Sequence, residues 1–150
     1  MRKYLTLLFI CLIPAFTAGC TKYIHAASAT SDFYGMYKTT DMINAEVTMY
    51  KKNSNIVCSG EIFLRPDKKL YYLKKEPIDG TIDLGCSDKT LIRAHITMTK
   101  PRFDGLKGNG HDQIDNIYSF EPVSGEVFRQ NIDKKQYKSS KNNIQKILKN

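Results

Sequence analysis

The segment LIRAHITMT, residues 91–99, decides the fold class because apolar and polar side chains alternate along it. One face carries Ile92, Ala94, Ile96 and Met98, and the opposite face carries Leu91, Arg93, His95 and Thr97. Successive side chains of a strand point to opposite sides of the sheet, so a period of two predicts a half-buried strand.

The same alternation recurs along the chain between turn signals rich in Gly, Asn, Asp and Pro. We expect further strands over residues 45–50, 56–64, 70–75, 81–86, 117–123 and 127–132, with a hairpin turn at Ser124 and Gly125. The Gly-, Asn- and Asp-rich segment 103–115 is interpreted as a long hairpin loop. About seven short strands predict an all-β domain, a small antiparallel β-sandwich or barrel.

The end of the chain changes period and charge. A short helix capped by Ser139 or Ser140 would place Ile144, Ile147 and Leu148 on one face. The lysines of this basic tail are Lys134, Lys135, Lys138, Lys141, Lys146 and Lys149. The tail either binds an anionic surface or is simply solvated, and the helix would pack on the domain, lie on a membrane or order on a partner.

The N-terminus has the layout of an export signal. Arg2 and Lys3 precede a short apolar run, and Thr17, Ala18 and Gly19 lead into Cys20. This small-residue box followed by Cys resembles that of bacterial lipoproteins, which most often have Leu where this chain has Thr17. The alternative is an ordinary secretory signal cleaved nearby.

The resemblance implies that residues 1–19 are removed and that Cys20 carries lipid, which anchors the chain to a membrane. Thr21 rather than Asp after the lipidated Cys favours the outer membrane of a Gram-negative envelope, facing the periplasm. The predicted organisation is a signal (1–19), a tether (20–40), a β domain (41–132) and the basic tail (133–150).

The cysteine count fits an exported chain. Cys11 leaves with the signal and Cys20 takes lipid, which leaves Cys58 and Cys86 to form one disulfide. A zinc site is the competing interpretation, but the three histidines have no zinc-type spacing to either Cys.

No catalytic residues, cofactor or metal site are predicted. None of the serines lies in a Gly-x-Ser-x-Gly elbow, and a calcium loop at 104–116 lacks the required ligand spacing. Segment 104–116 is instead the candidate binding loop, with Asp104, Asn109, His111, Asp112 and Asp115 as its candidate binding residues.

Charge sets limits on the partners. The chain has 23 Lys plus Arg against 15 Asp plus Glu, a formal net charge of +8. Export and the absence of Trp argue against nucleic acid. The first hypothesis is therefore a non-enzymatic envelope lipoprotein that binds another envelope protein or an anionic polymer. The alternative is an inhibitor of a host or rival hydrolase such as lysozyme, although the predicted β domain is neutral.

Overall fold

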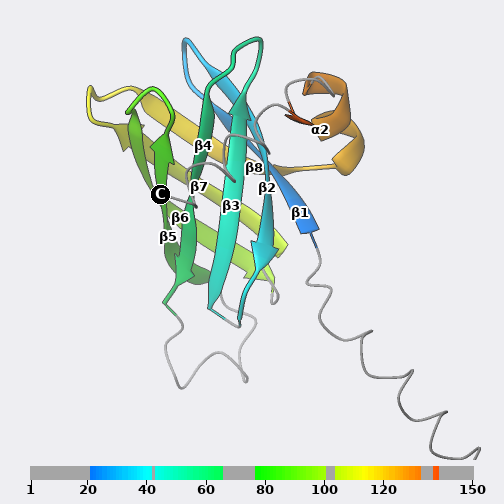
Figure 1. Cartoon of the computed structure of the whole chain (residues 1–150). Helices are drawn as coiled ribbons and strands as arrows, with labels where there is room; N and C mark the ends of the chain where they lie inside the picture. Colours follow the sequence, from blue (N-terminus) through cyan, green and yellow to red (C-terminus); the bar gives the residue numbers. More distant parts are fainter. Residues whose placement is uncertain (1–20, 42, 66–76, 101–103, 133–136, 139–150) are drawn as a thin grey trace, which may run out of the picture.

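A computed structural model describes residues 21–41, 43–65, 77–100, 104–132 and 137–138. Among these residues, eight antiparallel strands follow one another around a closed barrel (Figure 1). The strands are β1 Thr21–Ala27, β2 Asp32–Thr39, β3 Asn44–Lys51, β4 Val57–Leu64, β5 Ile78–Cys86, β6 Leu91–Lys100, β7 Asp104–Asp112 and β8 Ile117–Val123. A short helix, α2, spans Gly125–Asn131. The all-β prediction is therefore confirmed, and its barrel alternative is the observed one.

The barrel closes where β1 pairs with β8. Tyr23 to Ala27 lie opposite Val123 to Ser119 in an antiparallel register. His25 reinforces this seam, because its Nδ1 lies 3.2 Å from Oε1 of Glu121 on β8 and its Nε2 lies 3.2 Å from Oδ1 of Asp32 on β2. Its ring also stacks on Tyr34 with 4.4 Å between centroids. Closure pairs the edges that an open sheet would expose.

Side chains fill the interior. The alternation predicted for 91–99 is observed in β6, where Ile92, Ala94, Ile96 and Met98 are buried. The largest fully buried side chains come from all eight strands except β8 and are Tyr37, Ile24, Met49, Ile62, Leu64, Ile82, Ile92, Ile96, Met98, Leu106 and Val47. Tyr118 and Phe120 of β8 complete the core.

The predicted tether is wrong, and the β domain begins at Thr21 rather than near residue 41. Residues 21–39 form β1 and β2. Their inward positions are Ile24, Ala26, Phe33, Gly35 and Tyr37, so an alternation does exist. This alternation is hard to recognise in the sequence, because the inward-facing Gly and Ala are hardly more hydrophobic than the outward-facing residues. The turn at Ser28–Ser31 also interrupts it.

The predicted hairpin loop at 103–115 is also wrong, since β7 occupies most of it. Gly108 and Gly110 lie where the barrel wall leaves no room for a side chain. A Cβ on Gly110 would meet the Arg93 carbonyl oxygen and the Ala94 side chain of β6. Glycine in this strand therefore marks a close backbone approach rather than a loop.

A third correction concerns 127–132, which forms most of α2 and not a strand. Ser124 is the N-cap, and its hydroxyl accepts a hydrogen bond from the Val127 amide. Phe128 and Ile132 lie one helical turn apart and pack on Tyr34 and Tyr50, on the outer face of the barrel. Apolar residues at i and i+4 fit a helix on this surface better than a strand.

Other predictions fall outside the described residues. These are the signal, Cys20, the strand at 70–75, the helix after Ser139, and Lys134, Lys135, Lys141, Lys146 and Lys149. Within the described part of the chain, none of the helices has the length and apolar character needed to cross a membrane.

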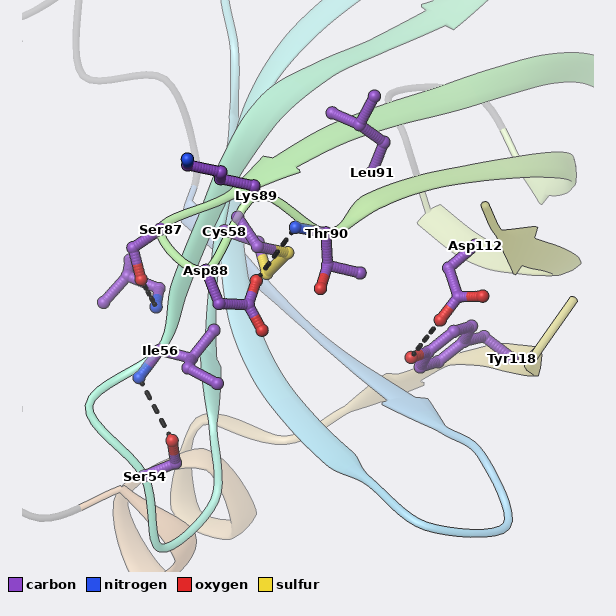
Figure 2. Close-up of a disulfide and its surroundings, with 12 residues drawn as sticks. Ser54, Ile56, Cys58, Ser87, Asp88, Lys89, Thr90, Leu91, Asp112 and Tyr118 are labelled. Atoms are coloured by element: carbon purple, nitrogen blue, oxygen red, sulfur yellow. Dashed lines mark hydrogen bonds between the residues drawn. A yellow bond between two sulfur atoms is a disulfide. The ribbon is translucent and has the colours of Figure 1, made fainter. Parts of the chain in front are cut away.

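The predicted disulfide between Cys58 and Cys86 is present. The two residues face each other across β4 and β5, and Cys58 is fully buried (Figure 2). The bridge closes a sequence separation of 28 residues.

We expect Cys58→Ala to lower the free energy of unfolding by about 3.5 kcal/mol, since the bridge restricts the unfolded chain. Urea denaturation of the oxidised protein measures this. Cys86→Ala should have a similar effect and the double variant little more, whereas unchanged midpoints in all three would argue against a native bridge.

A pair of glycine variants tests the barrel wall. Gly110→Ala should destabilise the fold strongly, because its methyl group would collide with the β6 backbone. Gly85→Ala is the matched control, since its Cβ would meet only Cδ2 of Leu91 at an ordinary 3.9 Å. Thermal melts that shift equally for the two variants would contradict this packing.

Candidate recognition surface

A shallow hollow lies on the outer face of β5, β6 and β7, near the hairpin ends of these strands. Its lining includes Asp83, Gly85, Leu91, Arg93, His111 and Gln113. The register explains the hollow: Asp83, Arg93 and His111 lie side by side across the three strands, and Gly85 faces Leu91 in the next row. Because Gly85 has no side chain, the surface is depressed beside Leu91.

Three large aliphatic side chains are exposed around this hollow. Leu91 is 62% exposed, Ile114 75% and Ile117 73%. Ile117 of β8 pairs with His111 of β7, and Ile114 lies in the turn between these two strands. Scattered apolar residues are ordinary on a surface, but three at one end of the barrel form a patch that a partner can bury.

Two hairpin turns hold Leu91 and Ile114 in place. In the β5–β6 turn, Oδ1 of Asp88 accepts a hydrogen bond from the Thr90 amide, next to the disulfide (Figure 2). Lys89 has a φ of 70°, the left-handed conformation that closes the turn. Gln113 bridges the two hairpins, because its Oε1 accepts from the Leu91 amide and its Nε2 donates to the Lys89 carbonyl.

Asp112 organises the β7–β8 turn. Its carboxylate accepts hydrogen bonds from the amides of Ile114 and Asn116 and from the Asn116 side chain. It also accepts a hydrogen bond from the Tyr118 hydroxyl (Figure 2). Burial alone would raise the pKa of Asp112, but these hydrogen bonds outweigh it and lower the pKa below its ordinary value. Burial and the Asp112 charge raise the pKa of Tyr118. The role of Asp112 is to hold the turn.

A row of charged residues crosses the outer face next to the patch. Glu46, Glu61 and Asp83 occupy directly opposed positions on β3, β4 and β5. Arg93 follows on β6, and its Nε donates a hydrogen bond to Asp83, which raises the pKa of the guanidinium. Lys38 lies at the other end of the row, opposite Glu46. Glu61 therefore has a carboxylate on each side, an arrangement that costs stability.

The structure separates the residues of the predicted binding loop. His111 lines the hollow, with its Nδ1 3.1 Å from the Asp112 carbonyl oxygen, and Asn109 is exposed further along β7. Asp115 lies in the turn with a φ of 61°. Asp104 begins β7, at the other end of the strand. Among the described residues, no cluster of His, Cys, Asp and Glu could hold a metal ion.

Sequence reasoning missed the apolar part of this surface. Leu91 and Ile117 were recognised only as members of strands. The sequence of one strand does not show which residues of other strands lie beside it at the end of the barrel. The exposed Leu91 lies on the same face of its strand as Arg93 and His95, which was the available signal.

Comparisons with known proteins give little guidance. No protein-family model matches the chain, and no curated protein matches it. A solved structure described as a de novo designed fluorescence-activating β-barrel matches with a TM-score of 0.48 and 13% identity, over 69% of this chain and 90% of that chain. The chain's own residues are therefore the basis for assigning a function.

The hydrogen bonds of Asp112 predict that the stability of the fold depends on pH. Because the pKa of Asp112 is lowered in the folded protein, its ionised form stabilises the fold above the ordinary carboxyl pKa of 3.8. That stability is lost as the pH falls through the lower folded pKa. Asp112→Asn should reduce the free energy of unfolding by about 1–3 kcal/mol at pH 7, and the difference from the unsubstituted protein should shrink below the ordinary carboxyl range.

Asp115→Asn is the control, since it makes the same chemical change at an exposed position in the same turn. It should alter the free energy of unfolding by less than about 0.5 kcal/mol. Equal effects of the two variants in chemical denaturation at pH 7 would rule out the proposed role of Asp112.

Proposed function

We propose that the chain is a lipid-anchored protein of the cell envelope with a non-enzymatic binding or structural role. The observation that carries this proposal is the short path from the expected anchor to the barrel. β1 begins at Thr21, the residue after Cys20. A lipid on Cys20 would therefore hold the barrel directly against the membrane surface, with one end facing the bilayer and the other facing away.

The form of the barrel supports binding on its outer surface. Its interior is occupied by side chains such as Met49, Ile62 and Ile96, each fully buried. The three most exposed aliphatic side chains of the described residues instead lie outside, at Leu91, Ile114 and Ile117. Such a patch suits contact with another macromolecule better than the enclosed binding of a small molecule.

The expected location is the outer membrane, with the barrel in the periplasm. The partner would be another envelope protein or an anionic envelope polymer. The basic tail is the element expected to contact an anionic polymer, because its six lysines give it a local positive charge.

A hydrolase inhibitor is the second candidate, and one observation favours it. The predicted β domain has no net charge, which argues against binding a basic enzyme. Three carboxylates nevertheless lie next to one another, on Glu46, Glu61 and Asp83. Such a row can face the positive surface of a protein such as lysozyme. Titration of lysozyme activity with the purified protein tests this candidate, and full activity at micromolar concentrations would remove it.

The anchor is tested by Cys20→Ser. We expect this variant to leave the membrane fraction and to lose labelling with palmitate, since the acyl chains supply the binding energy. Cell fractionation and metabolic labelling measure both effects. Cys11→Ser is the control, because Cys11 lies within the expected signal. A Cys20→Ser protein that stays labelled and membrane-bound would contradict the anchor.

A further inference from the structure

The chain that follows α2 returns to the outer face of the barrel. Beyond α2, which ends at Asn131, the structure describes Tyr137 and Lys138, and both have a helical backbone. The ring of Tyr137 lies 6.0 Å, between centroids, from the ring of Tyr50 on β3. Tyr50 also packs on Phe128 of α2. The basic tail therefore lies against the outer face of β3 at Tyr137.

A strip of small residues crosses the outer face beside this contact. Thr48, Ser59 and Gly85 lie directly opposite one another on the neighbouring strands β3, β4 and β5 (Figure 1). Leu91 of β6 faces Gly85 at the end of the strip, is 62% exposed and borders the hollow. Thr48 is two residues from Tyr50. Because a strand glycine allows another backbone to approach closely, the strip can accept a second layer of chain.

The length of a helix matches the length of this strip. Neighbouring strands are about 4.8 Å apart, so the strip from β3 to Leu91 on β6 is roughly 14 Å long. A helix that continues from Tyr137 rises about 1.5 Å per residue, which would bring Lys141 roughly 6 Å, Ile144 roughly 10 Å and Leu148 roughly 16 Å along it. Ile144 and Leu148 come seven and eleven residues after Tyr137, on the same face of such a helix. That face would turn toward the sheet, as the Tyr137 ring does.

Glu61, next to the strip on β4, lacks a cation beside it. Its directly opposed neighbours are Glu46 on β3 and Asp83 on β5, both carboxylates. Arg93 is paired with Asp83, and Lys38 stands opposite Glu46. Within the described part of the chain, Glu61 forms no ion pair. A lysine that reaches β4 would therefore relieve the repulsion among these carboxylates.

We propose that residues 137–150 dock on the strip as a helix, so that the basic tail covers the outer face of β3, β4 and β5. Each contact joins one tail residue to one barrel residue: Ile144 to Gly85, Leu148 to Leu91 and Lys141 to Glu61. An anionic polymer and the barrel then compete for the same tail. The inference goes beyond the proposed function, because the contact lies within the chain and needs neither the lipid anchor nor an envelope partner.

The test is the rate at which trypsin cleaves the tail of the oxidised exported chain, residues 20–150, with Cys20→Ser to keep it free of lipid. Cleavage after Lys146 is followed by mass spectrometry and compared with cleavage of a free peptide of residues 137–150. Only the undocked tail is cleaved, so the rate measures the undocked fraction. We expect cleavage in the protein to be at least about tenfold slower than in the peptide. Equal rates would overturn the proposal.

Two barrel variants locate the docking. Leu91→Ser should raise the cleavage rate about tenfold, because it removes the apolar contact. Glu61→Gln should raise it about two- to fivefold, which is the effect of losing an exposed ion pair. Ile117→Ser on β8 and Glu126→Gln on α2 are the controls, and they should leave the rate unchanged. All four side chains are exposed, so the barrel stays folded. Equal effects of the controls would contradict the proposed site.

A tail variant tests the same contact without changing the barrel. Leu148→Ser should raise the cleavage rate as much as Leu91→Ser, each measured against a peptide with the same tail sequence. The double variant should be little faster than either single variant, because both changes remove one contact. Effects that multiply in the double variant would show that the two side chains do not meet, and the proposal would be wrong.

A second copy of the chain is the competing occupant. Protection that increases with protein concentration would show that the tail docks on another molecule, which would overturn docking within the chain. A failure of docking leaves the proposed function in place, since cell fractionation of Cys20→Ser tests the anchor separately.

Discussion

Pairing between β1 and β8 is the constraint on which the rest of the structure depends. Tyr23 to Ala27 can meet Ser119 to Val123 only if all the intervening strands curve through a full turn. The small diameter that results brings neighbouring backbones so close that Gly60 and Gly110 have no space for a Cβ atom. It also fills the interior with side chains. The seam therefore determines both the glycine positions and the solid core.

Closure also makes the two ends of the barrel different. The first strand begins beside the proposed lipid site, and the four short hairpin turns gather at the far end. Local contacts hold two of these turns: the disulfide and Asp88 support the β5–β6 turn, and Asp112 supports the β7–β8 turn. Hydrogen bonds to the backbone amides of Leu91 and Ile114 hold these residues where their side chains are exposed to water.

The sequence predicts those parts of the fold whose side chains have strong apolar contrast. The alternation through Ile92, Ile96 and Met98 was sufficient to identify β6, and the cysteine count identified the disulfide. Prediction from the sequence failed in β1, β2 and β7, where small residues face inward. A segment rich in Ala and Gly has the composition of a tether or a loop, although here it forms part of the barrel wall. Prediction from the sequence also failed at α2. Its residue Phe128 packs on an outer surface that forms only when β1 and β8 close the barrel. The candidate surface depends on neighbours in four different strands, and local patterns do not reveal which residues meet.

The most direct test of the account measures how the lipidated protein sits on a bilayer. Spin labels carried by non-natural residues at position 38, opposite Thr21, and at position 114, in the β7–β8 turn, mark the two ends of the barrel. A nickel chelate attached to the lipid headgroups relaxes labels near the membrane. The account predicts strong relaxation at position 38 and weak relaxation at position 114. Stronger relaxation at position 114 would contradict it, because the aliphatic patch would then face the membrane. Equal relaxation would contradict it as well, because the barrel would then lie on its side.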